Sequence, residues 1–380
     1  MTKIGWELLA LFAFVACVSC GGSNRTLTAK SASPTTIASL TSWTLTPTSL
    51  NGAASEFGNV VYDPESSNWR MFYSAKSVVF SVSGPTSTSF PSTGTVALGF
   101  GPKGAWDSYS VNVPYVWYEV GQARPWRMLY RGSNGSSGLS TSLFQIGLAT
   151  AAPEVDGVID WQREDTHGAA LTAPVIPEAT TGWSANQFID FGSVMKYGGN
   201  YYIYYSTISN PRQIGLATSV NLVYWKQYPL NPLFKGVVNT ASLTQGPDKY
   251  HAGVLAPDQG FFCPDIVYWP NSDGSARWVL IVPHYSANFE SSLDVFTSTS
   301  PVFLSYLRQY AGKIIATANT TYTLDGSPAI DVDTPRIITD DISRNVVTSK
   351  LTGGKVTLVA SINTSTLGWR MVDFFWNPPK

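Results

Sequence analysis

The chain has 380 residues, 44% of them hydrophobic and 13% charged, and its formal net charge is −1. This length and composition predict a globular protein with a substantial core and exclude a disordered chain. Because Lys and Arg form no cluster, nucleic acid is not expected as a partner. The 13 Trp and 19 Tyr suit a large core, and also a surface that stacks on flat apolar faces such as those of sugar rings.

The N-terminus has the features of an export signal, which we predict over residues 1–20. Lys3 provides a weak positive start, and the apolar run 8–18 is too short to span a bilayer. The run ends in Cys17 and Cys20, followed by two glycines. This end resembles a bacterial lipoprotein processing site with either cysteine as the lipidated residue. Plain signal-peptide cleavage is the alternative. The sequence therefore predicts a secreted or cell-surface protein, in a bacterium a periplasmic or outer-membrane lipoprotein, that contacts a membrane only through a lipid anchor.

A flexible tether is predicted next, over residues 21–42, because this segment is rich in Ser, Thr and Ala and has no hydrophobic periodicity. The folded domain is predicted over residues 43–380. Since Cys17 and Cys20 belong to the leader, Cys263 is the only thiol of the mature domain. No internal disulfide can therefore form, and the core has to hold itself together.

One strand-like segment recurs along the domain, with an interval of about 75 residues between most copies. Its first copy reads Trp-Arg-Met-Phe-Tyr-Ser, and its second reads Trp-Arg-Met-Leu-Tyr-Arg. The five copies are residues 69–75, 126–132, 201–207, 278–286 and 356–361. Five such units, each with its own strands and turns, indicate a repeat architecture.

Each copy lies within a pattern of four short strands. A first strand precedes it, separated by turn residues such as those of 63–68 and 197–200. Third strands are predicted at 96–100, 145–150, 213–219 and 293–298, and fourth strands around Trp106, Trp161 and Trp225. The predicted fold class is all-β, a five-bladed β-propeller whose ring is closed by a strand near residues 43–47. A pair of β-sandwiches or a β-helix does not account for this period.

Carboxylates recur in the predicted first strands, which line the centre of a propeller. Glu56, Asp190 and Asp265 lie at similar distances before the repeated strand of their units, and the fifth unit offers Asp331 and Asp333. The second unit offers Tyr115 and Glu119 instead. Acidic residues at strand starts often bind backbone amides, but their recurrence in four units favours a shared function.

Cleavage of a glycosidic bond requires such carboxylates. One protonates the leaving oxygen and the other acts as base or nucleophile, at about 5 Å in retaining and roughly 6.5–9.5 Å in inverting enzymes. A third acidic group can raise the pKa of the acid. We therefore predict Glu56, Asp190, Asp265 and Asp333 as the catalytic set, acting on an oligo- or polysaccharide.

Two segments carry a resemblance to known glycosidases. Residues 261–269, Phe-Phe-Cys-Pro-Asp-Ile-Val-Tyr-Trp, are similar to a strand of the five-bladed families 43 (arabinanases and xylosidases) and 32 (invertases and levanases). Residues 214–225 resemble a blade end common to these families and to the mannoside phosphorylases of family 130. The resemblance implies a five-bladed glycosidase fold and gives Asp265 the role of the family 43 aspartate that modulates the pKa of the acid. Phe262 stands where family 32 has its acid, which argues against fructan cleavage.

Further residues are predicted to bind substrate. These are Trp183, His251, His284 and Arg336, of which the two histidines and the arginine suit sugar hydroxyls or a central calcium ion. The alternative for His284, which lies in an apolar strand, is a core position. No cofactor and no catalytic metal are predicted, a structural calcium ion in the channel being compatible with the residues. A monomer is expected.

Two other functions stay open. A non-catalytic propeller that binds polysaccharide at the cell surface would keep the aromatic pocket and lack the acid pair. A glycoside phosphorylase would need cationic side chains beside the acid to hold phosphate. Arg124, Arg127, Arg131 and Arg212 are available for this, but several of them fall on predicted outer strands or turns.

Overall fold

The computed structural model describes residues 44–49, 56–135, 144–164, 173–177, 179, 181–185, 187, 189–207, 212–235, 260–269, 277–285, 291–316, 323–324, 327–339, 341–345, 356–364 and 368–376. All of them belong to one compact unit, Ile37–Lys380. The predicted leader and tether, with Cys17 and Cys20, lie outside the described residues. No helix long and apolar enough to cross a membrane occurs in the described part.

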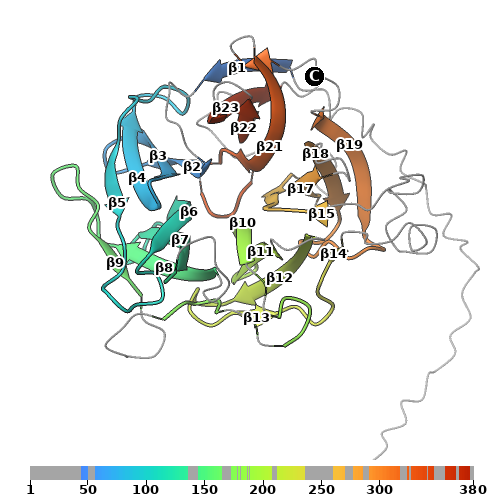
Figure 1. Ribbon diagram of the computed structural model, residues 1–380, viewed down its shortest axis with the longest axis horizontal. Coiled ribbons are helices and arrows are strands. Elements are labelled where there is room, and N and C mark those ends of the chain that lie inside the picture. The colour runs from blue at the N-terminus through green and yellow to red at the C-terminus, as the bar shows by residue number, and fades with distance from the viewer. Residues whose placement is uncertain are drawn as a thin grey trace, which may run out of the picture. The chain divides into compact units, whose positions relative to one another are not determined.

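The described strands form five antiparallel sheets placed around a common centre (Figure 1). The first blade contains β2 (Glu56–Asp63), β3 (Asn68–Ala75), β4 (Val78–Gly84) and β5 (Thr95–Leu98), and the second contains β6 (Ser110–Tyr118), β7 (Trp126–Ser133), β8 (Gln145–Ala151) and β9 (Trp161–Arg163). The third contains β10 (Ile189–Tyr197), β11 (Asn200–Thr207), β12 (Gln213–Ser219), β13 (Lys226–Gln227) and β14 (Phe234–Lys235). The fourth contains β15 (Gly260–Phe261), β16 (Asp265–Tyr268), β17 (Trp278–Tyr285), β18 (Ser291–Ser298) and β19 (Arg308–Ala316). The fifth contains β20 (Thr323–Leu324), β21 (Ser327–Ile337), β22 (Val356–Thr364), β23 (Gly368–Trp376) and β1 (Thr44–Ser49).

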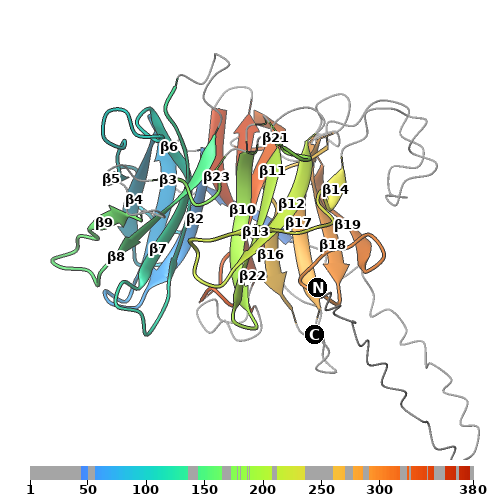
Figure 2. The same ribbon diagram turned by 90° about the horizontal axis from the view of Figure 1, so that it is seen from below.

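The predicted propeller and its repeat are confirmed. The five copies of the repeated segment are the second strands of the blades: β3, β7, β11, β17 and β22. The predicted ring closure is confirmed as well, because β1 pairs with β23 in antiparallel register, with Thr44 opposite Phe375. This pairing covers the nine-residue edge of β23 with β1, the first described strand, and so joins the two ends of the domain in one blade. Figure 2 shows the sheets from the side.

Two strand assignments were wrong. Residues 96–100 were predicted as a third strand but overlap β5, the fourth strand, since β4 takes the third place. The hairpin from β3 to β4 turns at Lys76 and Ser77, both with φ above zero (50° and 61°), the geometry of a type I′ turn that usually announces itself by Asn-Gly. Trp106 lies in a turn before β6, whereas Trp161 begins β9 as predicted and Trp225 immediately precedes β13.

Trp106 and Trp183 instead cover the third strands of the second and third blades. Trp106 stacks on Tyr130, with ring centroids 5.6 Å apart, and a Cβ added to Gly147 would lie 2.6 Å from it. A Cβ on Gly215 would likewise lie 2.3 Å from Trp183. The shared Ile-Gly-Leu-Ala-Thr sequence of β8 and β12 thus has its glycine because a tryptophan ring occupies the space of a side chain.

Candidate active site at the start of the central strands

The innermost strands β2, β6, β10 and β21 pair with the repeated strand of their blades in the same register at the end that carries Glu56, Asn112, Asp190 and Asp333. The residue opposite the sixth position of the repeated strand is acidic in three blades and Asn in one: Glu56 faces Ser74, Asn112 faces Arg131, Asp190 faces Ser206, and Asp333 faces Ser361. In the fourth blade Phe262 takes this place, its N–H donating to the carbonyl of Pro283 at 3.0 Å. The prediction that carboxylates recur at equivalent places is confirmed for Glu56, Asp190 and Asp333.

A bulge or break follows this position in every central strand. β2, β6, β10 and β21 shift register just after it, and the fourth blade divides here into β15 and β16. In three blades the bulge contains a residue with positive φ before a proline: Val113 (51°), Cys263 (30°) and Thr334 (49°). Residues before proline favour extended backbone, and a non-glycine residue in this region costs about 1–3 kcal/mol. Recurrent bulges and strain next to buried charges are typical of functional sites.

Asp190 is fully buried at the start of β10. Its carboxylate forms an ion pair with Arg131 of the neighbouring blade and accepts the backbone N–H of Phe191 at 2.8 Å. Burial raises the pKa of Asp190, and the positive charges of Arg131 and Arg336 offset only part of this effect. Asp190 is therefore harder to ionise than an exposed aspartate, although its ion pair with Arg131 favours the charged form.

Arg131 is itself held in place by two further contacts. Its Nε donates to Oδ1 of Asn112 at 2.9 Å, and its guanidinium lies 4.2 Å from the ring centre of Phe144. It occupies the sixth position of the repeated strand, where the first, third and fifth blades have Ser. The ion pair thus joins the second strand of one blade to the first strand of the next.

Asp333 is the second buried carboxylate of the site. It accepts a hydrogen bond from the Tyr285 hydroxyl at 3.1 Å and from the backbone N–H of Thr334 at 2.6 Å. The Arg212 guanidinium lies over the ring of Tyr285, 4.2 Å from its centre, and 4.8 Å from that of Phe262. A cation, a phenol and a carboxylate from three blades therefore meet here.

Cys263 lies between these charged groups. The negative charges of Asp190 and Asp333 raise the pKa of its thiol, and the positive charges of Arg336 and Arg131 lower it. Burial is the largest of the effects that raise the pKa of Cys263 well above its usual value, so the thiol stays neutral. The N–H of Cys263 donates to Oγ of Ser206, the residue opposite Asp190, at 3.3 Å. Cys263 also packs with Tyr285, which donates to Asp333.

Arg336 completes the cluster from the fifth blade. Its Nη1 donates to the carbonyl of Pro335 at 2.7 Å and its Nη2 to that of Gly192 at 3.3 Å. Within the described part of the chain, its buried Nε and the buried Oγ1 of Thr334 have no hydrogen-bond partner. Because buried polar atoms are nearly always paired, these two donors leave hydrogen-bonding positions for a water molecule or a ligand at this end of the ring.

Asp265 lies deeper than the other three acids. It faces Ile281, the fourth position of the repeated strand, so its predicted equivalence with Asp190 is wrong. Both of its oxygens accept from Nη2 of Arg344 at 2.6 Å, and Oδ2 accepts from the N–H of Ile337 at 2.6 Å. The ion pair fastens the fourth blade to the loop after β21.

The other predicted residues are placed as follows. Glu56 begins β2 in register with Asp190, although its side chain lies outside what is described, and His251 lies outside the described residues altogether. His284 stacks on Phe261 with ring centroids 4.9 Å apart and lies 3.4 Å from Asp294. Phe261 belongs to the core between the third and fourth blades. Trp183 packs on Gly215, away from the centre.

Of the predicted site residues, the described centre brings together Asp190, Asp333 and Arg336. Arg131, Cys263, Arg212 and Tyr285 also lie there; of these, the sequence had suggested Arg131 and Arg212 only as phosphate-binding residues of a phosphorylase. Arg131 could have been found, because it breaks the pattern of Ser at its repeat position. Arg212 and Tyr285 carry no comparable signal.

A group of acidic side chains that could bind a cation lies away from this centre in the described part of the chain. Among the described residues, acidic side chains close enough to share an ion are Asp63, Glu65 and Glu154, at the turn after β2. Arg70 lies among them, bonded to Asp63 at 2.7 Å and to Glu154. The arginine already pairs with two of the three carboxylates, and the predicted calcium ion of the channel remains a prediction.

The fold is similar to that of solved carbohydrate-active enzymes. The catalytic domain of the family 62 α-L-arabinofuranosidase of Coprinopsis cinerea matches with a TM-score of 0.56 at 12% identity, over 88% of this chain and 97% of that one. The endo-arabinase of Bacteroides thetaiotaomicron matches with a TM-score of 0.54 at 9% identity, over 88% and 97%. The chain has the five-bladed propeller fold of these glycoside hydrolases. The α-L-arabinofuranosidase of Podospora anserina, solved with cellotriose, gives 0.53 at 12% identity, over 89% and 98%.

No protein-family model matches the chain, and no curated protein matches it. The expected resemblance to five-bladed glycosidases is thus confirmed at the level of the fold. Since one fold carries many reactions, the reaction has to be argued from the site.

Proposed function

We propose that the protein is a glycoside hydrolase that acts on an oligo- or polysaccharide outside the cytoplasm. The observation that carries the proposal is that two buried carboxylates, Asp190 and Asp333, flank Cys263 at the start of the central strands. Ser206, opposite Asp190, accepts the N–H of Cys263 at 3.3 Å. Tyr285, which packs with Cys263, donates to Asp333 at 3.1 Å. A glycosidic bond is cleaved by such a pair of carboxylates. The export signal expected from residues 1–20 supports the location.

The environments of the two carboxylates differ, and we propose a different role for each. Burial raises the pKa of Asp190, which suits the general acid that protonates the leaving oxygen. Asp333 accepts hydrogen bonds from Tyr285 and Thr334, which hold its carboxylate in place, and it is proposed as the base or nucleophile. Glu56, in register with both, is proposed as the third acidic group. Asp265 is proposed to position the fourth and fifth blades rather than to act on substrate.

A non-catalytic, sugar-binding propeller is the second candidate. Asp190 is completely buried and already paired with Arg131, and an acid locked in this way does not donate a proton to a substrate unless the pair opens. The phosphorylase alternative is supported less. Arg131 and Arg212 lie at the centre, whereas Arg124 bonds Thr150 and Arg127 lies 4.0 Å from Glu119, at the opposite ends of the strands.

The test is hydrolysis of aryl glycosides and of plant, algal and fructan polysaccharides by the mature protein and by Asp190→Asn and Asp333→Asn. Both substitutions should lower kcat at least a hundredfold, since general acid–base catalysis contributes about 10²–10⁴-fold. Asp107→Asn is the matched control, because Asp107 is a fully buried partner of Arg163, at 2.6 Å, away from the centre. Sugar binding without turnover by the wild-type protein would favour the second candidate, and equal losses in Asp107→Asn would contradict the proposed roles.

A further inference from the structure

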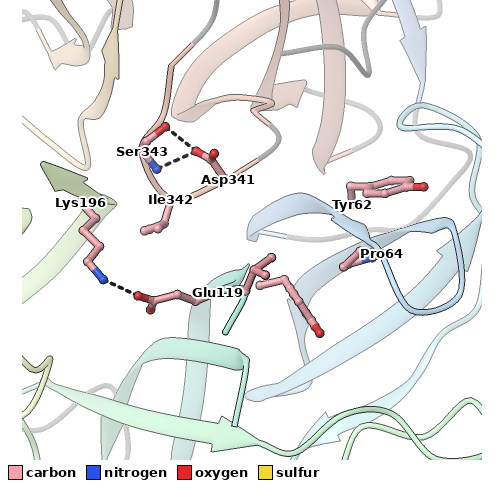
Figure 3. Close-up of a pocket in the computed structure, with 9 residues that line it drawn as sticks. Tyr62, Pro64, Glu119, Lys196, Asp341, Ile342 and Ser343 are labelled. Atoms are coloured by element: carbon pink, nitrogen blue, oxygen red, sulfur yellow. Dashed lines mark hydrogen bonds and ion pairs between the residues drawn. The ribbon is translucent and has the colours of Figure 1, made fainter. Parts of the chain in front are cut away.

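A pocket lies at the end of the central strands opposite to Asp190 and Asp333. Its volume is about 360 Å³, and it is surrounded by the ends of β2, β6 and β10 and by the loop after β21 (Figure 3). Its lining residues are Tyr62, Pro64, Tyr118, Glu119, Val120, Lys196, Asp341, Ile342 and Ser343. Lys196 follows Asp190 by six positions of the same strand, so the two ends are separated by roughly 20 Å at about 3.3 Å per residue.

Packed side chains separate this pocket from the proposed active site. Arg344 is bonded to Asp265, and the buried Tyr115 ring lies near both Arg336 and Arg344, 5.6 and 5.8 Å from their guanidinium carbons. The gap beside Tyr115 and Arg344 measures about 20 Å³, which holds about one water molecule. A ligand in this pocket therefore does not reach Asp190 through the centre of the ring.

The charged wall of the pocket is balanced. Glu119 accepts Nζ of Lys196 at 2.5 Å and the hydroxyl of Tyr201 at 2.7 Å. Burial by itself would raise the pKa of Glu119, but the bonds from Lys196 and Tyr201 hold it below its usual value. Glu119 is thus a fixed carboxylate paired with a fixed ammonium, and not a proton donor.

The loop at the other side of the pocket is also held in one conformation. Both the N–H and the hydroxyl of Ser343 donate to Asp341, at 2.8 and 2.5 Å. The N–H of Lys196 donates to the carbonyl of Ile342 at 2.8 Å, and Arg344 is anchored on Asp265. The pocket is therefore formed before any ligand arrives, which lowers the entropic cost of binding.

The remaining wall is apolar and partly aromatic. The Tyr62 ring is held edge-on against Trp69 at 5.5 Å, and the Tyr118 ring against Trp126 at 5.2 Å. Flat apolar surfaces with a few fixed polar groups at the edge are the pattern of a small-molecule site, and the volume lies near the lower end of the usual 300–1,000 Å³. A sugar ring matches this lining, since its C–H face packs on tyrosine and its hydroxyls bond to Glu119, Lys196 and Asp341.

We propose that this pocket is a second carbohydrate-binding site that holds one neutral sugar residue or a disaccharide without cleaving it. The neutral class follows from the Glu119–Lys196 pair and from the exposed carboxylate of Asp341, which repels an anionic sugar. The proposal does not depend on whether Asp190 and Asp333 cleave a bond, because it rests on a different end of the ring.

The test is saturation-transfer NMR and calorimetry on the mature protein with neutral mono- and disaccharides and with glucuronic and galacturonic acids. Tyr62→Ala and Asp341→Asn should each weaken binding of a neutral sugar at this site at least tenfold. Tyr306→Ala is the control, since Tyr306 is 77% exposed and outside the pocket lining. Asp341 is exposed, so its substitution tests the site even if Tyr62→Ala fails to fold.

Asp190→Asn separates this proposal from the proposed function. Binding that persists in Asp190→Asn and is lost in Tyr62→Ala and Asp341→Asn supports the second site. Sugar binding that is lost in Asp190→Asn and unchanged in the other two would place the bound sugar at the central carboxylates and overturn the proposal. The absence of binding by any neutral sugar, or tighter binding of the uronic acids through Tyr62 and Asp341, would overturn it as well.

Discussion

Replacing Arg344 by Leu should leave the buried carboxylate of Asp265 without its cation. Both side chains are almost fully enclosed, at 6% and 0% exposure, and the two oxygens of Asp265 each lie 2.6 Å from Nη2 of Arg344. Removing one partner of a buried pair costs about 3–5 kcal/mol, because the other charge stays desolvated. We expect a loss of this size in the free energy of unfolding of Arg344→Leu.

Urea denaturation followed by tryptophan fluorescence measures this loss. The double variant Asp265→Leu/Arg344→Leu should recover much of it, since two apolar side chains replace the pair and no unpaired charge is left. A cost below about 1 kcal/mol for Arg344→Leu, the range of an exposed ion pair, would refute the structural role given to Asp265. A double variant less stable than the single one would refute the electrostatic explanation.

Three further predictions concern the centre and the closure of the ring. Gly192→Ala should lose about 1–3 kcal/mol in the same assay, since a Cβ there would lie 1.7 Å from the carbonyl oxygen of Pro264, whereas Gly99→Ala, with no atom within 4 Å of the added Cβ, is the control. Because the pKa of Asp190 is raised in the folded state, its contribution to stability is present below the unfolded value near 3.8 and is lost as pH rises through the folded pKa. Denaturation at a series of pH values should show this loss in the wild-type protein and not in Asp190→Asn, and identical pH profiles would contradict it. Deleting residues 44–49 should expose the edge of β23 and produce oligomers in size-exclusion chromatography, and a monodisperse, equally stable truncated protein would show that the closure is dispensable.

The number of blades could be predicted because the repeated strand is written in local sequence. Apolar and aromatic residues that pack between blades recur with little change, as in Met71 and Met128 at equivalent, fully buried places. Glycine-rich and polar turns marked most hairpins. Where a turn lacked these signals, as at Lys76–Ser77, the count within the blade was off by one strand.

The candidate site was only partly predictable. Asp190 and Asp333 could be predicted as site residues because they lie near the starts of first strands. In every blade of a propeller the first strand lines the centre. Counting residues failed for Asp265, since the break between β15 and β16 changes the register of that strand. Bulges of this kind depend on contacts such as the bond from Ser193 to the carbonyl of Pro264 at 3.0 Å, which joins segments far apart in sequence.

Most strands, their period and the residue types at the centre could be predicted from the amino-acid sequence, because they depend on alternation, turn residues and composition over a few positions. The folded ring decided which charges are paired, since Arg131 reaches Asp190 and Arg344 reaches Asp265 across different blades. It also decided that the lower ends of the central strands enclose a pocket with a balanced Glu119–Lys196 wall. Burial and ionisation are properties of neighbours in space, and closing the ring is what makes these residues neighbours.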